Sequence, residues 1–302
     1  MENYKIIQNL KIKMQNYNSK LKIIFIGTPQ FGAIILEELI RNNYQPVLVI
    51  TNLDKPAGRK QILTPPPVKL TAQKYKISIE QPERIKNYEL GIRNLKPDLI
   101  ICAAYGKMIP KEILEIPCYG CLNVHPSLLP KYRGPSPIQA AILNGDKETG
   151  VTIMLMDEKM DHGPILNQRE LEFSILNFQF SKLHDKLADL GAKLLLETIP
   201  DWINGKIKSK TQDEKKATYT KIIKKEDGKI DWKKPAQEIE KKIRAFNPWP
   251  GAFTFIQKKG KKIRIKICQA ELSKDNNKLI IKKLQPEGKK PMSFEEFKKG
   301  YL

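Results

Sequence analysis

The chain has 302 residues, 40% of them hydrophobic, and carries a formal net charge of +21 at pH 7. This length predicts two domains, of which the larger can bury an ordinary hydrophobic core. Every apolar run is much shorter than the roughly 20 residues that span a bilayer, and the N-terminus has neither the apolar core nor the cleavage site of a secretory signal. We therefore predict a cytoplasmic protein without a membrane span.

The short apolar runs alternate with segments of helical periodicity from about residue 22, which is the pattern of strands and helices in a parallel sheet. We predict strands at 22–26, 46–51, 98–105, 121–125 and 150–156, with helices beginning near residues 66, 84, 110 and 135 and an amphipathic helix at 181–199. The sequence thus predicts an α/β domain over residues 21–204, with a doubly wound, mostly parallel sheet. Residues 1–20 are expected to be an N-terminal extension without fixed structure, and Met14 is an alternative start.

The C-terminal part has a different character. Beyond a predicted linker at 205–218, a helix at 235–246 and strands at 252–257, 263–268 and 279–284 indicate a small, mostly β domain over residues 219–302. Residues 206–302 hold 28 Lys and Arg against 12 Asp and Glu, a net of +16. Part of this enrichment is compositional, because the chain has 46 lysines and only eight arginines. Its position still predicts that this domain attracts a polyanion.

Two further motifs give weaker signals. Gly27 and Gly32 flank the first predicted strand–helix turn and Asp54 follows the second strand, but the spacing is neither Gly-x-Gly-x-x-Gly nor a phosphate loop, so a nicotinamide cofactor is disfavoured. Cys118 and Cys121 have the spacing of half a zinc site, yet no second pair follows. We predict reduced thiols and no metal.

The strongest chemical signal lies at 121–134. Asn123 and His125 are two apart on a predicted strand, so both side chains project from one face, and Pro126 ends the strand there. Ligands bind at the carboxyl ends of such strands in open parallel sheets. Asp161 follows the strand that ends near Met156 and could reach the same edge to orient the imidazole. An amide donor, a titratable ring and an acid are therefore expected together.

These segments resemble the folate-dependent formyltransferase superfamily, and within it the branch that formylates methionine on initiator tRNA. The resemblance runs from about residue 21 to the end of the chain. The stretches that carry it are 26–31, 54–59, 123–134, 148–152, 161–163, 244–251 and 284–290. It implies a Rossmann-like formyltransferase domain followed by a small, shortened β-barrel-like domain, because two strands of the family's barrel are missing after residue 277.

The resemblance also implies a reaction. The methionine amine attacks the formyl carbon of 10-formyltetrahydrofolate, Asn123 and protonated His125 stabilise the oxyanion, and Asp161 orients the imidazole and helps to move the proton. The residues expected to line the folate pocket are Tyr105, Gly106, Ile109, Ser127, Leu128, Leu129 and Pro130. Those expected to contact tRNA are Arg59, Lys60, Lys258, Lys259, Lys261 and Lys262. A monomer is expected.

Alternatives and one departure remain. Another member of the superfamily would act on a sugar-nucleotide amine or on glycinamide ribotide, and the inserted loop at 54–59 argues against it. A non-catalytic RNA-binding protein would fit the charge but has no need of Asn123, His125 and Asp161. His162 stands where the family usually has a small residue, so we expect it to perturb its neighbour Asp161.

Overall fold

The computed structural model describes residues 21–58, 60–172, 178–258, 260–275 and 277–301. They form two compact units. The first consists of Met1–Arg133, Gly150–Leu171 and Lys186–Thr218, without the undescribed residues 1–20 and 59. The second consists of Gly134–Thr149, Glu172–Asp185 and Tyr219–Leu302, so two short segments from the middle of the chain cluster with the C-terminal part. Among the described residues, no helix is long and apolar enough to cross a membrane.

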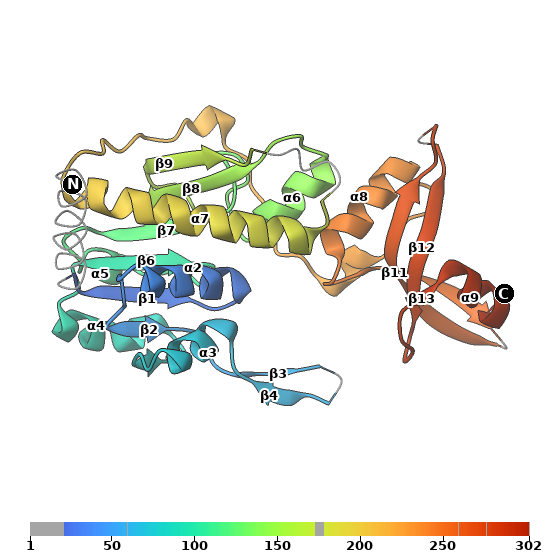
Figure 1. Cartoon of the computed structure of the whole chain (residues 1–302), viewed down its shortest axis with the longest axis horizontal. Helices are drawn as coiled ribbons and strands as arrows, with labels where there is room; N and C mark the ends of the chain where they lie inside the picture. The colour runs from blue at the N-terminus through green and yellow to red at the C-terminus, as the bar shows by residue number, and fades with distance from the viewer. Residues whose placement is uncertain (1–20, 59, 173–177, 259, 276, 302) are drawn as a thin grey trace, which may run out of the picture. The chain divides into compact units, whose positions relative to one another are not determined.

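The first unit is organised by a seven-stranded sheet in the order β5-β2-β1-β6-β7-β8-β9 (Figure 1). The strands are β1 (Ile23–Gly27), β2 (Leu48–Ile50), β5 (Ile79–Glu80), β6 (Leu99–Ala103), β7 (Cys121–His125), β8 (Gly150–Leu155) and β9 (Ile165–Glu170). The first five are mutually parallel, whereas β8 runs antiparallel to both β7 and β9. The doubly wound, mostly parallel sheet predicted from the sequence is confirmed.

The central strands of this sheet are buried on both faces, as expected when helices cover a parallel sheet. The core on one face joins alternate residues of the central strands, such as Ile24 and Ile26, to Ile92 and Ile113 from two short helices. The helices of the unit are α2 (Gln30–Arg41), α3 (Pro67–Lys74), η1 (Ile85–Tyr88), α4 (Glu89–Leu95), α5 (Lys111–Leu114) and the Lys186–Ile203 part of α7 (Phe180–Ile203). Because β6 and β7 are parallel neighbours, their carboxyl ends lie at the same edge of the sheet.

Two elements of this unit differ from those predicted from the sequence. A two-stranded hairpin, β3 (Lys55–Ala57) and β4 (Ile62–Thr64), extends away from the sheet after β2 (Figure 1). The predicted end of the long helix at residue 199 is wrong, because α7 continues through Pro200 to Ile203. Its last turn is held from outside, where the Trp202 indole donates to the Tyr119 carbonyl at 2.8 Å. That contact favours continuation of the helix despite Pro200, which removes one backbone hydrogen bond.

The second unit contains a four-stranded antiparallel sheet in the order β10-β11-β12-β13. Its strands are β10 (Ala252–Lys258), β11 (Lys261–Leu272), β12 (Leu279–Pro286) and β13 (Met292–Ser293). Its helices and turns are α6 (Pro137–Asn144), η3 (Lys225–Gly228), α8 (Ala236–Phe246) and α9 (Phe294–Tyr301), while η2 (Glu214–Lys216) belongs to the first unit. The small antiparallel sheet agrees with the shortened C-terminal domain expected from the sequence.

The sheet of the second unit is an open one among the described strands, because β10 and β13 do not pair. A helix that the sequence did not predict lies at this gap. Phe297 of α9 is buried in the same core as Ile239 and Ile265, and the Lys258 ammonium at the end of β10 lies over the Tyr301 ring, 4.3 Å from its centroid. Helix α9 therefore takes the place of strands that would otherwise close a barrel.

Candidate active site

Strand β7 presents Asn123 and His125 side by side at the carboxyl edge of the sheet. Both are buried, Asn123 with 8% and His125 with 4% of its surface exposed. The strand pairs with β6 on one side and β8 on the other, and this pairing fixes the direction of both side chains. An amide and an imidazole removed from bulk water act on a bound ligand more strongly than exposed groups do.

The His125 ring has a different protein partner at each nitrogen. Its Nε2 lies 3.0 Å from the backbone carbonyl oxygen of Tyr132, and its Nδ1 lies 3.6 Å from Oδ2 of Asp161. Because a carbonyl oxygen only accepts, Nε2 carries a proton and donates it to Tyr132. The Nδ1 atom is therefore the nitrogen that can exchange a proton with a substrate, and it faces the acid that the sequence predicted.

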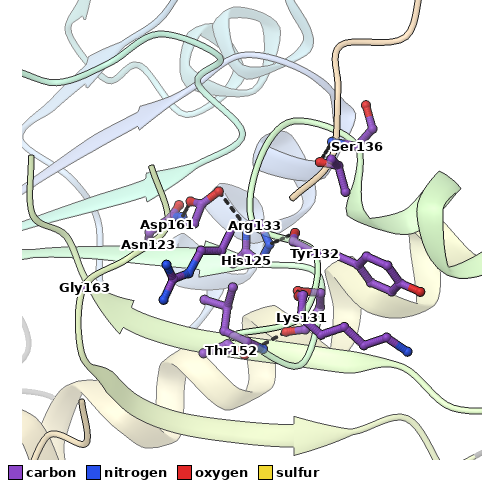
Figure 2. A network of polar contacts seen from close by, with 12 residues as sticks. Asn123, His125, Lys131, Tyr132, Arg133, Ser136, Thr152, Asp161 and Gly163 are labelled. Atoms are coloured by element: carbon purple, nitrogen blue, oxygen red, sulfur yellow. Dashed lines mark hydrogen bonds and ion pairs between the residues drawn. The ribbon is translucent and has the colours of Figure 1, made fainter. Parts of the chain in front are cut away.

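Asp161 closes the group from the turn that follows β8. Its Oδ1 accepts a hydrogen bond from the Asn123 amide nitrogen at 3.3 Å. Figure 2 shows the Asp161 and Asn123 side chains beside the His125 ring, with Tyr132 on the ring's other side. The structure thus brings together the three residues that the sequence singled out. The distance from Asp161 to the ring is too long for a direct hydrogen bond, so Tyr132 is the ring's close orienting partner.

The loop after β7 is held by one buried hydroxyl. Oγ1 of Thr152 on β8 donates to the Ser127 carbonyl at 2.7 Å and accepts from the Leu129 backbone nitrogen at 3.1 Å and from Gln168 at 2.8 Å. The Ser127 hydroxyl in turn donates to the Lys131 carbonyl at 2.6 Å. These bonds fix the path of the backbone up to Tyr132, and so the position of the carbonyl that orients the His125 ring.

A buried arginine connects this loop to a segment far along the chain. The Arg133 side chain is fully buried, and its guanidinium donates to Oε1 of Gln212 from two nitrogens, at 3.0 and 2.9 Å. The same group forms a two-pronged pair with Glu214, at 3.0 and 2.6 Å. The hydrogen bond from Arg133 lowers the pKa of Glu214 below its ordinary value. Residues 212–214, predicted to lie in a linker, thus contribute to the site.

The backbone of the Asp161 turn is held by the other end of the same network. The Gln212 amide nitrogen donates to the carbonyls of Asp161 and Gly163, at 2.9 and 2.7 Å. Asp161 has a left-handed φ of 47°, and a Cβ added to Gly163 would lie 1.9 Å from the Leu155 carbonyl oxygen. Gln212 therefore stabilises a turn whose backbone conformation at Asp161 is strained.

The residues predicted to line a folate pocket follow two adjacent parallel strands. Tyr105, Gly106 and Ile109 come after β6, and residues 127–130 come after β7. Tyr105 and Ile109 pack in the hydrophobic core, and burial raises the pKa of Tyr105 to about 12. The Tyr105 hydroxyl has no hydrogen-bond partner among the described residues. Gly106 is exposed with a φ of 75°, so of these three residues after β6 it is the one open to a ligand.

The structure describes four of the six residues that are predicted to contact tRNA. Lys60 is exposed in the turn between β3 and β4, whereas Arg59 and Lys259 lie outside the described residues. Lys261 and Lys262 begin β11, and the Lys262 ammonium lies 4.4 Å from the centroid of the Phe255 ring. Lys258 serves the fold as well, because it donates to the Gly300 carbonyl of α9.

The weaker sequence motifs have structural explanations. A Cβ on Gly27 or Gly32 would lie 2.7 Å from the Ala103 carbonyl oxygen, so these glycines allow β1 and α2 to pack closely on β6. Burial raises the pKa of the Cys121 thiol, whereas Cys118 is exposed. Among the described residues, no three His, Cys, Asp or Glu side chains gather as metal ligands.

Comparison with known proteins identifies the family of this arrangement. A family model described as formyl transferase matches residues 21–199, and one described as formyl transferase, C-terminal domain, matches residues 222–279. The chain belongs to the formyl transferase family. It is 44% identical over 300 residues to a methionyl-tRNA formyltransferase from Bacillus velezensis, an alignment that covers 92% of this chain and 94% of that protein.

Solved formyltransferase structures share the fold. The methionyl-tRNA formyltransferase from Clostridium thermocellum matches with a TM-score of 0.59 at 20% identity, covering 88% of this chain and 98% of that one. The N-formyltransferase from Helicobacter canadensis, solved with folinic acid and dTDP-3-aminofucose, matches with a TM-score of 0.63 at 23% identity over 84% of this chain and 88% of that one. At these identities the likeness concerns the fold.

Sequence reasoning missed several residues that complete this formyltransferase site. Tyr132 and Arg133 lie within the motif at 123–134, but their roles depend on a backbone carbonyl and on partners some 80 residues away. Thr152 lies in the matching stretch 148–152 but was given no role, and Gln212 lies in no motif; the burial of both residues reveals them. For Gln212, a polar residue inside a predicted linker gave no signal at all.

Proposed function

We propose that this chain transfers the formyl group of 10-formyltetrahydrofolate to the free amino group of methionine on initiator tRNA, for translation initiation. The observation that carries the proposal is the position of the Asp161 carboxylate, which lies 3.3 Å from the Asn123 amide nitrogen and 3.6 Å from Nδ1 of His125. The names of its curated relatives support the same substrate, since they are methionyl-tRNA formyltransferases over nearly their whole length.

The geometry gives each group a role. When the methionine amine attacks the formyl carbon, negative charge develops on the formyl oxygen, and a preorganised donor lowers that barrier. The Asn123 amide nitrogen has two hydrogens, of which one is directed at Asp161. We assign the other to the developing oxyanion.

His125 acts through Nδ1, because the Tyr132 carbonyl holds its Nε2 proton. In the protonated ring, Nδ1 donates toward the oxyanion. The Asp161 carboxylate faces the same nitrogen. Because the ring then has a proton on both nitrogens, the carboxylate is the group that accepts the proton from the attacking amine and passes it to the departing folate nitrogen. No step needs a metal.

The donor set fits a folate co-substrate at the carboxyl edge of the sheet. The loops after β6 and β7 reach this edge together, because their strands are parallel neighbours. Exposed Gly106 and the chain from Ser127 to Pro130 would line the pocket, and Thr152 keeps the second loop in place. We expect Tyr105 and Ile109 to support the pocket from the core rather than to touch the folate, since both side chains are buried there.

Contacts with tRNA are assigned to two exposed basic surfaces, each on its own unit. The first is the β3–β4 hairpin with Lys60, and Arg59 in the same turn remains a prediction outside the described residues. The second is the start of β11 with Lys261 and Lys262. Lys258 and the undescribed Lys259 flank it. These contacts supply affinity for phosphates and take no part in the chemical step.

The function is tested by offering the full-length protein 10-formyltetrahydrofolate with three acceptors in separate reactions: methionine-charged initiator tRNA, methionine-charged elongator tRNA and a sugar-nucleotide amine. We expect rapid formylation of the first only. Asn123→Ala, His125→Ala and Asp161→Ala should each reduce transfer by at least about a hundredfold with the fold intact, and pairs of these changes should be far from additive. Near-normal turnover by folded His125→Ala protein, or a preference for the sugar nucleotide, contradicts the proposal.

A further inference from the structure

His162, the residue after Asp161, lies between two carboxylates. Its Nδ1 is 2.5 Å from Oδ2 of Asp157, at the start of the same turn, and its Nε2 is 3.5 Å from Oε1 of Glu214. The other carboxylate oxygen of Asp157 accepts from the Lys159 backbone nitrogen at 3.0 Å. The ring thus contacts the turn that contains Asp161 through Asp157, and the segment at 212–216 through Glu214.

The chemistry of the ring suits this bridge. Only the imidazolium form has a hydrogen on both nitrogens, so only that form can donate toward both carboxylates at once. The charged groups around it are Asp157 and Lys159 from its own turn, with Glu214 and Arg133 facing it from other segments. The ring is directed at these two carboxylates, and a direct effect of His162 on Asp161 stays a prediction.

The bridge closes a ring of contacts around the Asp161 turn. From His162 it runs to Glu214, through the Arg133 guanidinium to Gln212, and back to the carbonyl of Asp161. Arg133 also follows directly after Tyr132, whose carbonyl holds the His125 ring. The positions of the acid and of the imidazole are therefore coupled through one buried guanidinium.

We propose that His162 is a positioning residue, which by bridging Asp157 and Glu214 holds the Asp161 turn, and with it the His125 ring, in the geometry that formyl transfer needs. The inference rests on the proposed function for its rate effect. All three side chains of the bridge are partly exposed, between 29% and 56%, so the bridge adds little to stability. Its effect falls on geometry, where a displacement of about 1 Å can cost up to a hundredfold in rate.

The kinetic test compares His162→Ala and His162→Gln with His184→Ala in the full-length protein. His184 is the matched control, because its ring also pairs with an aspartate, Asp185 at 2.8 Å, in a part of the chain that carries no proposed chemistry. We expect His162→Ala to lower kcat about tenfold, with both KM values within twofold and the melting temperature nearly unchanged. His162→Gln, which keeps one donor, should recover part of the rate, and His184→Ala should behave as wild type.

A double-mutant cycle separates the bridge from a general effect. Glu214→Gln removes the charge at the far end of the bridge, and its partner Arg133 is common to all variants. If His162 acts through Glu214, the double variant is no slower than the slower single variant. Fully additive losses of kcat would mean that the two residues act independently, which overturns the proposal.

A spectroscopic readout does not depend on activity. The chain has three histidines, so the imidazole nitrogen resonances of His125 can be assigned with single variants. We expect these resonances to shift in His162→Ala and to stay in place in His184→Ala. Superimposable His125 resonances, or a kcat within twofold of wild type, overturn the proposal. If the wild type forms no formylmethionyl-tRNA, the proposed function fails. The His125 resonances alone then show whether His162 positions the His125 ring. If His162→Ala does not fold, His162→Gln is measured in its place.

Discussion

Replacing Arg133 tests how much the site depends on one buried guanidinium. The side chain is fully buried and makes four hydrogen bonds, two to Gln212 and two to Glu214. Arg133→Ala leaves the buried amide oxygen of Gln212 without these donors, which costs about 1–3 kcal/mol. The lost pair with the half-exposed Glu214 adds less than a fully buried pair would, and the vacated volume adds a cavity.

The sum is a destabilisation of about 3–5 kcal/mol, most of it from the unsatisfied Gln212 amide and the vacated volume. With roughly 2–4 °C per kcal/mol for a domain of 150–250 residues, we expect the melting temperature to fall by roughly 10 °C. Arg133→Lys should lose nearly as much, because a single ammonium cannot reproduce the guanidinium fork. Turnover should fall together with stability, because the Tyr132 carbonyl and the Asp161 turn both depend on this side chain.

The control is Arg169→Ala. Arg169 also forms a two-pronged pair with a glutamate, Glu197 at 2.9 and 2.6 Å, but both side chains are about half exposed. Such a surface pair contributes less than about 1 kcal/mol. Thermal unfolding followed by circular dichroism distinguishes the two variants. Melting temperatures within about 2 °C of each other would refute the argument that burial makes the Arg133 network decisive.

Three further outcomes are expected. Asp54→Asn should raise KM for tRNA several-fold and leave KM for folate unchanged, because Asp54 anchors the base of the β3–β4 hairpin through Lys69 at 2.8 Å. Lys261→Gln and Lys262→Gln should each reduce the salt slope of tRNA binding by about 0.7–0.9 if they contact phosphates, and unchanged slopes would exclude such contacts. The lowered pKa of Glu214 means that its pairing stabilises the fold above its ordinary pKa of 4.5 and is lost as the pH falls below it, so wild type and Glu214→Gln should converge in stability in acid denaturation.

The central strands of the sheet could be predicted because they are continuous apolar runs. Strands β1, β2, β6 and β7 are buried at every position. Strand β5 has only two residues, and the edge strand β9 has two apolar residues followed by four polar ones, so neither gives a strong periodic signal. Nothing in the sequence encodes the antiparallel direction of β8, because the chain leaves the first unit between Arg133 and Gly150.

The chemistry of the site could be predicted, whereas its supports could not. Asn123, His125 and Asp161 are recognisable because each residue type has a function at a strand end. The supports act through backbone atoms, such as the Tyr132 carbonyl, or through an ordinary amide such as Gln212. A sequence specifies such contacts only through the fold, since their partners lie 7 residues away in one case and 51 in the other.

The position of the acid explains why so many supports are needed. Asp161 has a left-handed backbone, which costs an ordinary residue on the order of 1–3 kcal/mol unless its surroundings impose it. Gly163 permits the turn by having no Cβ to strike the Leu155 carbonyl, but a glycine alone also leaves the turn free to adopt other shapes. The two hydrogen bonds from Gln212 select one of them. Gln212 is in turn held by Arg133, so the strain at the acid is balanced by a network that begins beside the imidazole it serves.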